Sequence, residues 1–178
     1  MHKSGVLAWK APLVPPLGFW VYGRRLRGGA LLYRASVQDV RQGNPSRKRG
    51  CLVVVMQFYP RFLTREKVDE YVRGLAPDKA LFTEFKSQER ASADHDGAFE
   101  AVDYQNRFDL VPAGWSELQR LSDHSKTRDT FLICQCALHQ RCHADLLLLA
   151  TRYFFQADIP APRIKYPLFE VRLPQMRS

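Results

Sequence analysis

Two short, continuous apolar segments, one in each half of the chain, predict the central strands of a sheet. Residues 51–58 read Cys-Leu-Val-Val-Val-Met-Gln-Phe, and residues 130–135 read Thr-Phe-Leu-Ile-Cys-Gln. Runs of this length and apolar content, the first of them rich in β-branched residues, are typical of strands buried on both faces of a parallel sheet. A third segment, residues 30–36, is apolar and aromatic enough to form another short strand.

Apolar residues spaced three and four apart predict helices between these strands. The helical patterns begin near Thr64 and Asp78, cover residues 98–110, surround Trp115, and run from Cys142 to about Phe155. Residues 37–50 and 87–97 are polar and are predicted to form loops, and residues 168–173 are expected to form an edge strand. Because strands alternate with helices, we predict a single α/β domain with a small, mostly parallel sheet.

The composition agrees with one globular domain. The chain has 178 residues, of which 46% are hydrophobic and 25% are charged, and no apolar run approaches the roughly 20 residues that a membrane span requires. Pro12, Pro15 and Pro16 interrupt the apolar stretch near the N-terminus, which argues against a secretory signal. Four cysteines without such a signal indicate a reducing compartment, so we expect a cytoplasmic protein that does not associate with membranes.

Positive charge is concentrated at the N-terminal end. Residues 1–50 carry ten of the 27 Lys and Arg side chains but only one of the 18 acidic ones, Asp39, so the net charge of +9 belongs to this segment. We expect residues 1–29 to form a basic, poorly ordered extension and residues 30–178 to form the domain. Such an extension can contact nucleic-acid phosphates, although basic ends are more often simply solvated.

The densest chemistry of the chain lies between the second apolar run and the last helix. Residues 134–143 contain Cys134, Cys136, His139, Cys142 and His143. A thiol at the start of a helix faces unpaired backbone N–H groups, which favour the thiolate form. Cys142 is therefore a candidate nucleophile, with His143 or His139 as its base. All the thiols can equally be small buried hydrophobic groups, which is the simplest interpretation of Cys51.

The same cysteines allow a second interpretation, a zinc site. Cys134, Cys136, His139 and Cys142 are the candidate ligands. Their spacing lacks the paired C-x2-C units of most structural zinc sites, and adjacent residues such as Cys142 and His143 are expected to have difficulty in reaching one ion.

Several of these residues together carry a resemblance to a known family. The pattern Leu-Ile-Cys134 followed by Cys142-His143, with Tyr104, Arg107 and Phe108 and with Phe58-Tyr59-Pro60-Arg61, resembles domain-of-unknown-function family 488 (DUF488). The resemblance covers residues 30–155 and implies a Rossmann-like α/β domain with a shared pocket. It places Arg61, Tyr104, Cys134, Cys142 and His143 at that pocket. The chain departs from the family at Ala144, where Arg is common, and at Cys136, where an acidic residue is common.

Our leading hypothesis is that this pocket binds a small anion, a nucleotide or a nucleic-acid phosphate. The alternatives are a thiol-dependent enzyme that uses Cys142 and a zinc-stabilised interaction module. The side chains expected to bind the ligand are Tyr59, Arg61, Tyr104, Arg107, Cys134, Gln135 and Arg141.

Overall fold

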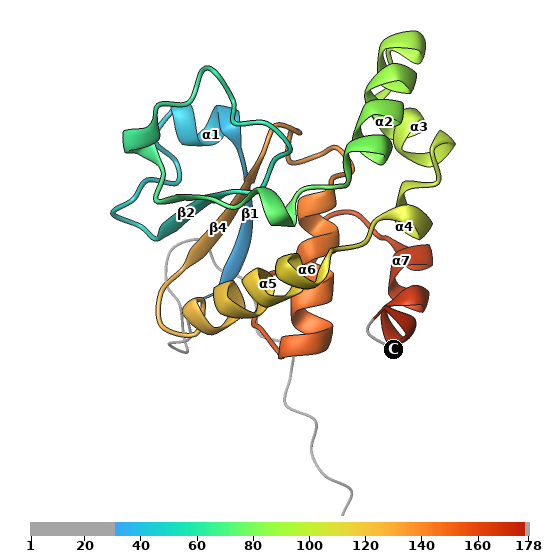
Figure 1. Cartoon of the computed structure of the whole chain (residues 1–178). Helices are drawn as coiled ribbons and strands as arrows, with labels where there is room; N and C mark the ends of the chain where they lie inside the picture. The colour runs from blue at the N-terminus through green and yellow to red at the C-terminus, as the bar shows by residue number, and fades with distance from the viewer. Residues whose placement is uncertain (1–30, 177–178) are drawn as a thin grey trace, which may run out of the picture.

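A four-stranded parallel sheet forms the centre of the protein (Figure 1). The computed structural model describes residues 31–176, so the predicted N-terminal extension, residues 1–29, lies outside the described residues. The sheet has the order β1-β4-β2-β3, and every neighbouring pair of strands is parallel. Its strands are β1 (Leu32–Ser36), β2 (Cys51–Val54), β3 (Glu70–Tyr71) and β4 (Thr130–Cys134). The prediction of a single α/β domain with a parallel sheet is confirmed.

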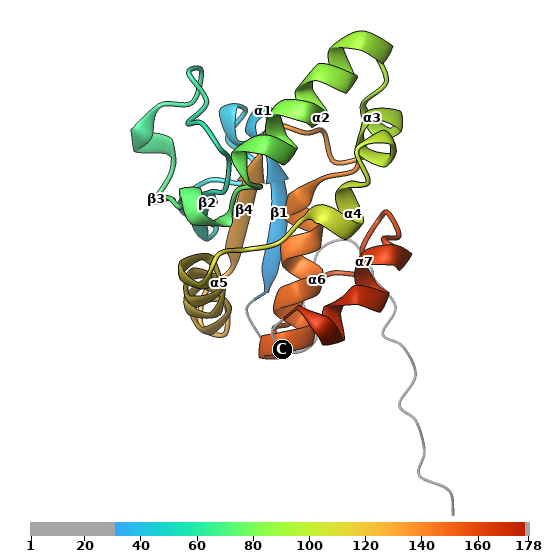
Figure 2. The same cartoon turned by 45° about the vertical axis from the view of Figure 1, so that its right-hand side comes forward.

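Helices cover both faces of the sheet and extend beyond it. The helices are α1 (Val37–Arg41), α2 (Lys79–Ser92), α3 (His95–Ala101), α4 (Tyr104–Arg107), α5 (Pro112–His124), α6 (His143–Phe155) and α7 (Pro167–Arg172). Short 3-10 turns span Arg65–Lys67, Arg73–Leu75 and Leu173–Gln175. Helices α2, α3, α4 and α7 gather on one side of the molecule, on the right in Figures 1 and 2.

Successive residues of the strands point into two different cores. In β2, Leu52 and Val54 belong to a smaller core that α1 covers, whereas Cys51 and Val53 belong to a larger core that includes α5 and α6. Cys134, at the end of β4, also points into the larger core. The alternation therefore places this thiol on the same face of the sheet as α6.

Three predictions of local structure are wrong, wholly or in part, because helices form where loops or a strand were expected. Residues 37–50 begin with helix α1, which Ser36 and Asp39 start by reciprocal capping hydrogen bonds. Residues 87–97 are mostly helical, because α2 continues to Ser92. Residues 168–173 lie largely in helix α7, which Pro167 begins, and they do not form an edge strand.

Two other predicted helices are not continuous. The segment that follows Thr64 forms 3-10 turns around the short strand β3 in place of a helix. The predicted helix over residues 98–110 is split into α3 and α4, because Asp103 adopts a left-handed conformation with φ of 51°. The helices expected after Asp78, around Trp115 and after Cys142 are confirmed as α2, α5 and α6.

The strand β4 is followed by residues 135–142, which we call the β4 exit, and then by α6. This order places the first turn of α6 at the carboxyl edge of the sheet, where open α/β sheets bind ligands. Within residues 31–176, no helix has the length and apolar character needed to cross a membrane.

Candidate functional site

Three cysteines and one histidine meet where β4 ends and α6 begins. We call Cys134, Cys136, Cys142 and His143 the cysteine–histidine cluster. The Sγ atom of Cys134 lies 3.7 Å from the Sγ atom of Cys136 and 3.7 Å from Nδ1 of His143. The Sγ atom of Cys142 lies 3.9 Å from the same Nδ1 atom. Residues eight or nine positions apart in the sequence thus share one small volume.

The local backbone of α6 explains how adjacent residues point to the same place. Cys142 is the N-cap of α6 and has an extended conformation, while His143 is the first helical residue. The Cys142 Sγ atom accepts a hydrogen bond from the backbone N–H of Ala144, 3.4 Å away. The two adjacent side chains, which were expected to have difficulty in reaching one point, therefore do converge, because the chain turns between them.

The orientation of the His143 ring is fixed by the end of β2. Nε2 lies 2.6 Å from the carbonyl oxygen of Val55, which can only accept a hydrogen bond, so Nε2 carries the proton that is donated. In the neutral ring, the lone pair is then on Nδ1, which is the nitrogen that faces the sulfur atoms. His143 is buried, so the hydrogen bond of its ring is shielded from solvent.

The close sulfur atoms and the imidazole perturb one another. Hydrogen bonds from the Cys136 and Cys142 side chains lower the pKa of Cys134 well below its usual range. Burial alone would lower the pKa of His143, but attraction to the sulfur atoms of Cys134 and Cys142 raises it well above its usual value. The pKa of the Cys136 thiol shifts the other way and is raised well above its usual value by its hydrogen bonds to Cys134 and Cys142. Negative charge is thus favoured on the Cys134 sulfur beside the His143 ring, which suits either nucleophilic chemistry or metal binding.

The cluster forms part of the wall of a cavity of about 120 Å³. Aromatic side chains supply much of the remaining wall: Phe58, Phe82, Phe85, Phe99 and Tyr104. Phe99 and Tyr104 are stacked with their ring centroids 4.2 Å apart, and burial raises the pKa of Tyr104 well above its usual value. Lys86 and Arg141 add cationic groups to the lining. The cavity is smaller than the roughly 300–1,000 Å³ of most ligand sites, so it admits a single small group.

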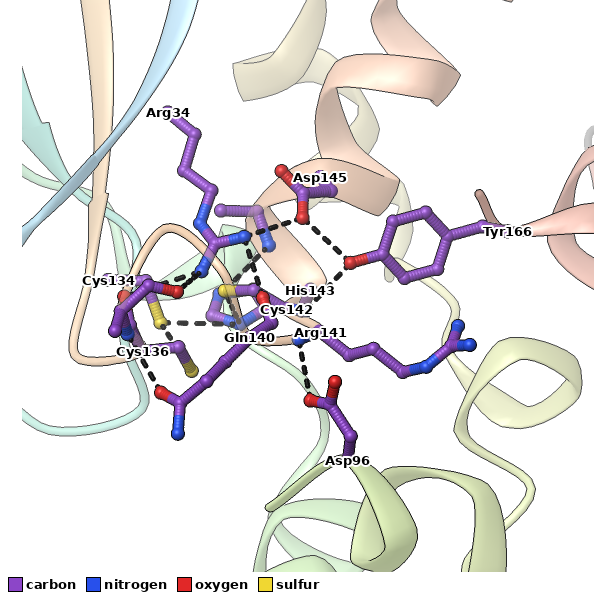
Figure 3. Close-up of polar contacts among 12 residues, drawn as sticks. Arg34, Asp96, Cys134, Cys136, Gln140, Arg141, Cys142, His143, Asp145 and Tyr166 are labelled. Atoms are coloured by element: carbon purple, nitrogen blue, oxygen red, sulfur yellow. Dashed lines mark hydrogen bonds and ion pairs between the residues drawn. The ribbon is translucent and has the colours of Figure 1, made fainter. Parts of the chain in front are cut away.

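A buried arginine from β1 holds the β4 exit in place (Figure 3). The Arg34 guanidinium donates to the carbonyl oxygens of Cys136, Ala137 and Gln140, at 3.3, 2.6 and 3.0 Å. It also forms an ion pair with Asp145 at 2.6 Å, with 5% of the Arg34 side chain exposed. The geometry of this loop therefore depends on a charge from another strand.

Tyr166 provides a second support on the other side of α6 (Figure 3). Its hydroxyl accepts a hydrogen bond from the backbone N–H of Cys142 at 2.9 Å and donates one to Asp145 at 2.7 Å. The Asp96 carboxylate accepts from the backbone N–H of Arg141 at 2.8 Å. These contacts fix the backbone on which Cys142 and His143 stand.

The structure brings together only part of the predicted site. The predicted residues that line the cavity are Tyr104, Cys134, Gln135, Cys136, Arg141, Cys142 and His143. Tyr59 packs in the smaller core, where its ring meets Tyr71 edge-on at 5.5 Å. Arg61 and His139 are exposed and do not line the cavity. Arg107 is exposed as well and pairs with Glu84 at 2.7 Å.

Sequence reasoning missed Arg34, Asp145 and Tyr166. Arg34 was counted as one of many basic residues, although it lies in an apolar segment that forms a strand. A charge inside a buried strand requires partners, and this was the signal that could have identified it. No comparable pattern marks Tyr166, because its role depends on where α7 begins.

The fold and the cluster define a class: a small parallel α/β domain with a cysteine–histidine cavity at the carboxyl edge of its sheet. A family comparison gives the particular assignment. The family DUF488-N3a, described as the active DUF488-N3 subclade, matches residues 37–152, which is more than half of the chain. The protein therefore belongs to the DUF488 family, as the resemblance implied. No match was found among curated proteins or solved structures.

Proposed function

We propose that this protein binds a small, flat, ring-shaped group in the aromatic cavity, beside the cysteine–histidine cluster. A nucleotide with a single-ring pyrimidine base is the ligand class that we propose, because only its base has to enter the cavity. The observation that carries this proposal is that the cluster lies in the wall of a cavity to which five aromatic side chains also contribute. Aromatic walls hold flat bases by stacking, and a reactive group at contact distance is positioned for chemistry.

The cations at the cavity support an anionic substituent on the ligand. The Lys86 ammonium pairs with Glu89 at 2.5 Å, and Arg141 reaches the Glu100 carboxylate at 3.2 Å, so both are held near the lining. This arrangement keeps the anion and Arg141 of the leading hypothesis but replaces Arg61 and Arg107 with Lys86. The four cysteines are free thiols, which is in keeping with a cytoplasmic protein.

Nucleic-acid binding through the basic N-terminal segment stays a prediction, because that segment lies outside the described residues. A thiol-dependent enzyme is the second candidate function. The hydrogen bond from the Ala144 N–H to the Cys142 sulfur favours it, since such a donor stabilises a thiolate at a helix start.

Titration calorimetry with uridine monophosphate, uridine and inorganic phosphate tests the proposed ligand class. Phe82 is half-buried and meets Phe58 edge-on at 5.7 Å, so Phe82→Ala removes part of the wall without opening the main core. Loss of one stacking partner weakens base binding by about tenfold. Phe62→Ala is the matched control, because Phe62 is 77% exposed and does not line the cavity.

A separate variant tests the proposed contact between Lys86 and the phosphate group of the ligand. Lys86→Met is expected to weaken the binding of uridine monophosphate several-fold while leaving the binding of uridine unchanged. Lys79→Met, at the exposed start of α2, is expected to alter the affinity for neither compound. Equal binding by wild type and Phe82→Ala, or binding of inorganic phosphate alone, would contradict the proposal.

A further inference from the structure

We propose that Cys134, Cys142 and His143 form a three-ligand site for zinc or a similarly soft divalent cation, with the fourth coordination position open to the aromatic cavity. One sulfur comes from the last residue of β4, one from the N-cap of α6, and the nitrogen from the first residue of α6. Two sulfurs and one imidazole are also a ligand set found in catalytic zinc sites, where a water or a substrate takes the fourth position.

The spacing of the ligand atoms supports the site. With Zn–S bonds of about 2.3 Å and Zn–N bonds of about 2.0–2.1 Å, a tetrahedral ion holds sulfur and nitrogen about 3.5 Å apart. The observed separations from Nδ1 of His143 are 3.7 Å to Cys134 and 3.9 Å to Cys142. All three ligand atoms lie within 4.8 Å of one another. The two sulfur–nitrogen separations thus need shifts of only a few tenths of an ångström, and the two sulfurs need to approach to about 3.8 Å, the S–S distance of a tetrahedral ion with Zn–S bonds of about 2.3 Å.

The surroundings of the histidine support the same conclusion. Histidines that bind metals usually donate their second N–H to a carbonyl or a carboxylate, which fixes the tautomer and the ring orientation. His143 does this through Nε2 and the Val55 carbonyl, at 2.6 Å, which leaves the Nδ1 lone pair directed at the sulfurs. A histidine that is buried only for packing has no need to direct its ring nitrogen toward two thiols.

This set differs from the ligands that the sequence suggested. His139 is exposed and is not a member of the compact group, and His143 takes its place. Cys136 lies 3.7 Å from the Cys134 sulfur but is also outside that group of three. It is partly exposed and lines the cavity, so it stands beside the open position and is not one of the three ligands. The use of the open position by a ligand rests on the proposed function, whereas the metal site itself does not.

Metal content of the purified protein, measured by elemental mass spectrometry, gives the first test. We expect about one zinc per chain in wild type and in Cys136→Ser, and a loss of at least tenfold in Cys134→Ser, Cys142→Ser and His143→Ala. Cys51→Ser is the matched control, because Cys51 is also buried but lies outside the cluster, where burial raises its pKa to about 11. Far-ultraviolet circular dichroism verifies that each variant is folded.

Cobalt titration of chelator-treated wild type needs no variant. Binding is expected to produce thiolate-to-cobalt absorption in the near ultraviolet, and added imidazole is expected to change the visible bands if the fourth position is open. Absence of zinc and of cobalt absorption would overturn the proposal. Metal loss in Cys136→Ser as complete as in Cys134→Ser would overturn the open position, because it would show a closed four-ligand site.

Alkylation separates the metal site from the thiol-enzyme candidate. We expect iodoacetamide to label Cys142 only after chelator treatment, whereas rapid labelling of the untreated protein would contradict the metal site. Calorimetry with uridine monophosphate on zinc-loaded and chelator-treated protein keeps the two proposals distinguishable. Metal binding without nucleotide binding refutes only the proposed ligand, and nucleotide binding without metal refutes only the metal site.

Discussion

Two segments that leave the same edge of the sheet contribute differently to the cavity. The β4 exit, residues 135–142, and the segment after β2, residues 55–62, both follow buried parallel strands that are hydrogen-bonded neighbours. The first carries Cys136 and Cys142 of the cysteine–histidine cluster to the cavity. The second lines the cavity only with Met56, Gln57 and Phe58. Beyond them it exposes Arg61 and Phe62, and it directs Tyr59 into the smaller core, where the guanidinium of Arg65 lies 3.9 Å from the centre of the Tyr59 ring.

The element that follows each strand explains the difference. After β4 the chain enters α6, which packs in the larger core and turns Cys142 and His143 back toward the strand. After β2 only the first residues, Met56 to Phe58, line the cavity, and the chain then passes to β3 at the edge of the sheet, so the segment's side chains from Tyr59 onward do not line the cavity. A position at the carboxyl edge is thus insufficient for a site, and a packed neighbouring element is also required.

Removal of the charge that holds the β4 exit is expected to have the largest effect on stability. Arg34→Met removes the donor of three loop carbonyls and the ion-pair partner of Asp145. Deleting one member of a buried ion pair costs about 3–5 kcal/mol of unfolding free energy. Urea denaturation followed by fluorescence measures the loss. Arg61→Met is the control, and a similar loss in both variants would contradict the contrast between the two segments.

The second support of the β4 exit is expected to give a smaller effect. Tyr166→Phe keeps the buried ring but removes the hydroxyl that bridges Cys142 and Asp145. Leaving a buried donor unpaired costs about 1–3 kcal/mol. Tyr153→Phe is the matched control, because Tyr153 is 46% exposed and has no part in the cluster. Hydrogen exchange of the Cys142 amide sharpens the test, since its protection is expected to fall in Tyr166→Phe alone.

Local sequence patterns predicted the parts of the fold that short-range physics determines. The apolar runs of β2 and β4 and the helical spacing of α2, α5 and α6 were identified, because burial on both faces of the strands and along one side of the helices dictates each pattern. The path from Thr64 to Leu75 was not, because its apolar spacing resembles a helix while pairing with β2 makes part of it a strand. Tertiary pairing overrode the local preference at that point.

The candidate site was predicted in the same uneven way. Cys134, Cys142 and His143 were found because they cluster in the sequence at a strand-to-helix junction. Arg61 and Arg107 were assigned to the ligand on position and family resemblance, and the structure turns both away from the cavity. Arg34 lies more than one hundred positions from the loop that it holds, so only the pairing of β1 with β4 brings them together.

The smallest effect is expected at the segment after β2. Arg61 is exposed and does not line the cavity, so Arg61→Ala should change the unfolding free energy by less than about 0.5 kcal/mol. The affinity for uridine monophosphate and the zinc content should also stay at wild-type values, whereas Lys86→Met should lower the affinity for the nucleotide. A tenfold loss of nucleotide affinity in Arg61→Ala, at unchanged stability, would mean that this segment closes over the bound ligand. The part of this segment beyond Phe58 would then also belong to the site, and its contrast with the β4 exit would hold only for the ligand-free protein.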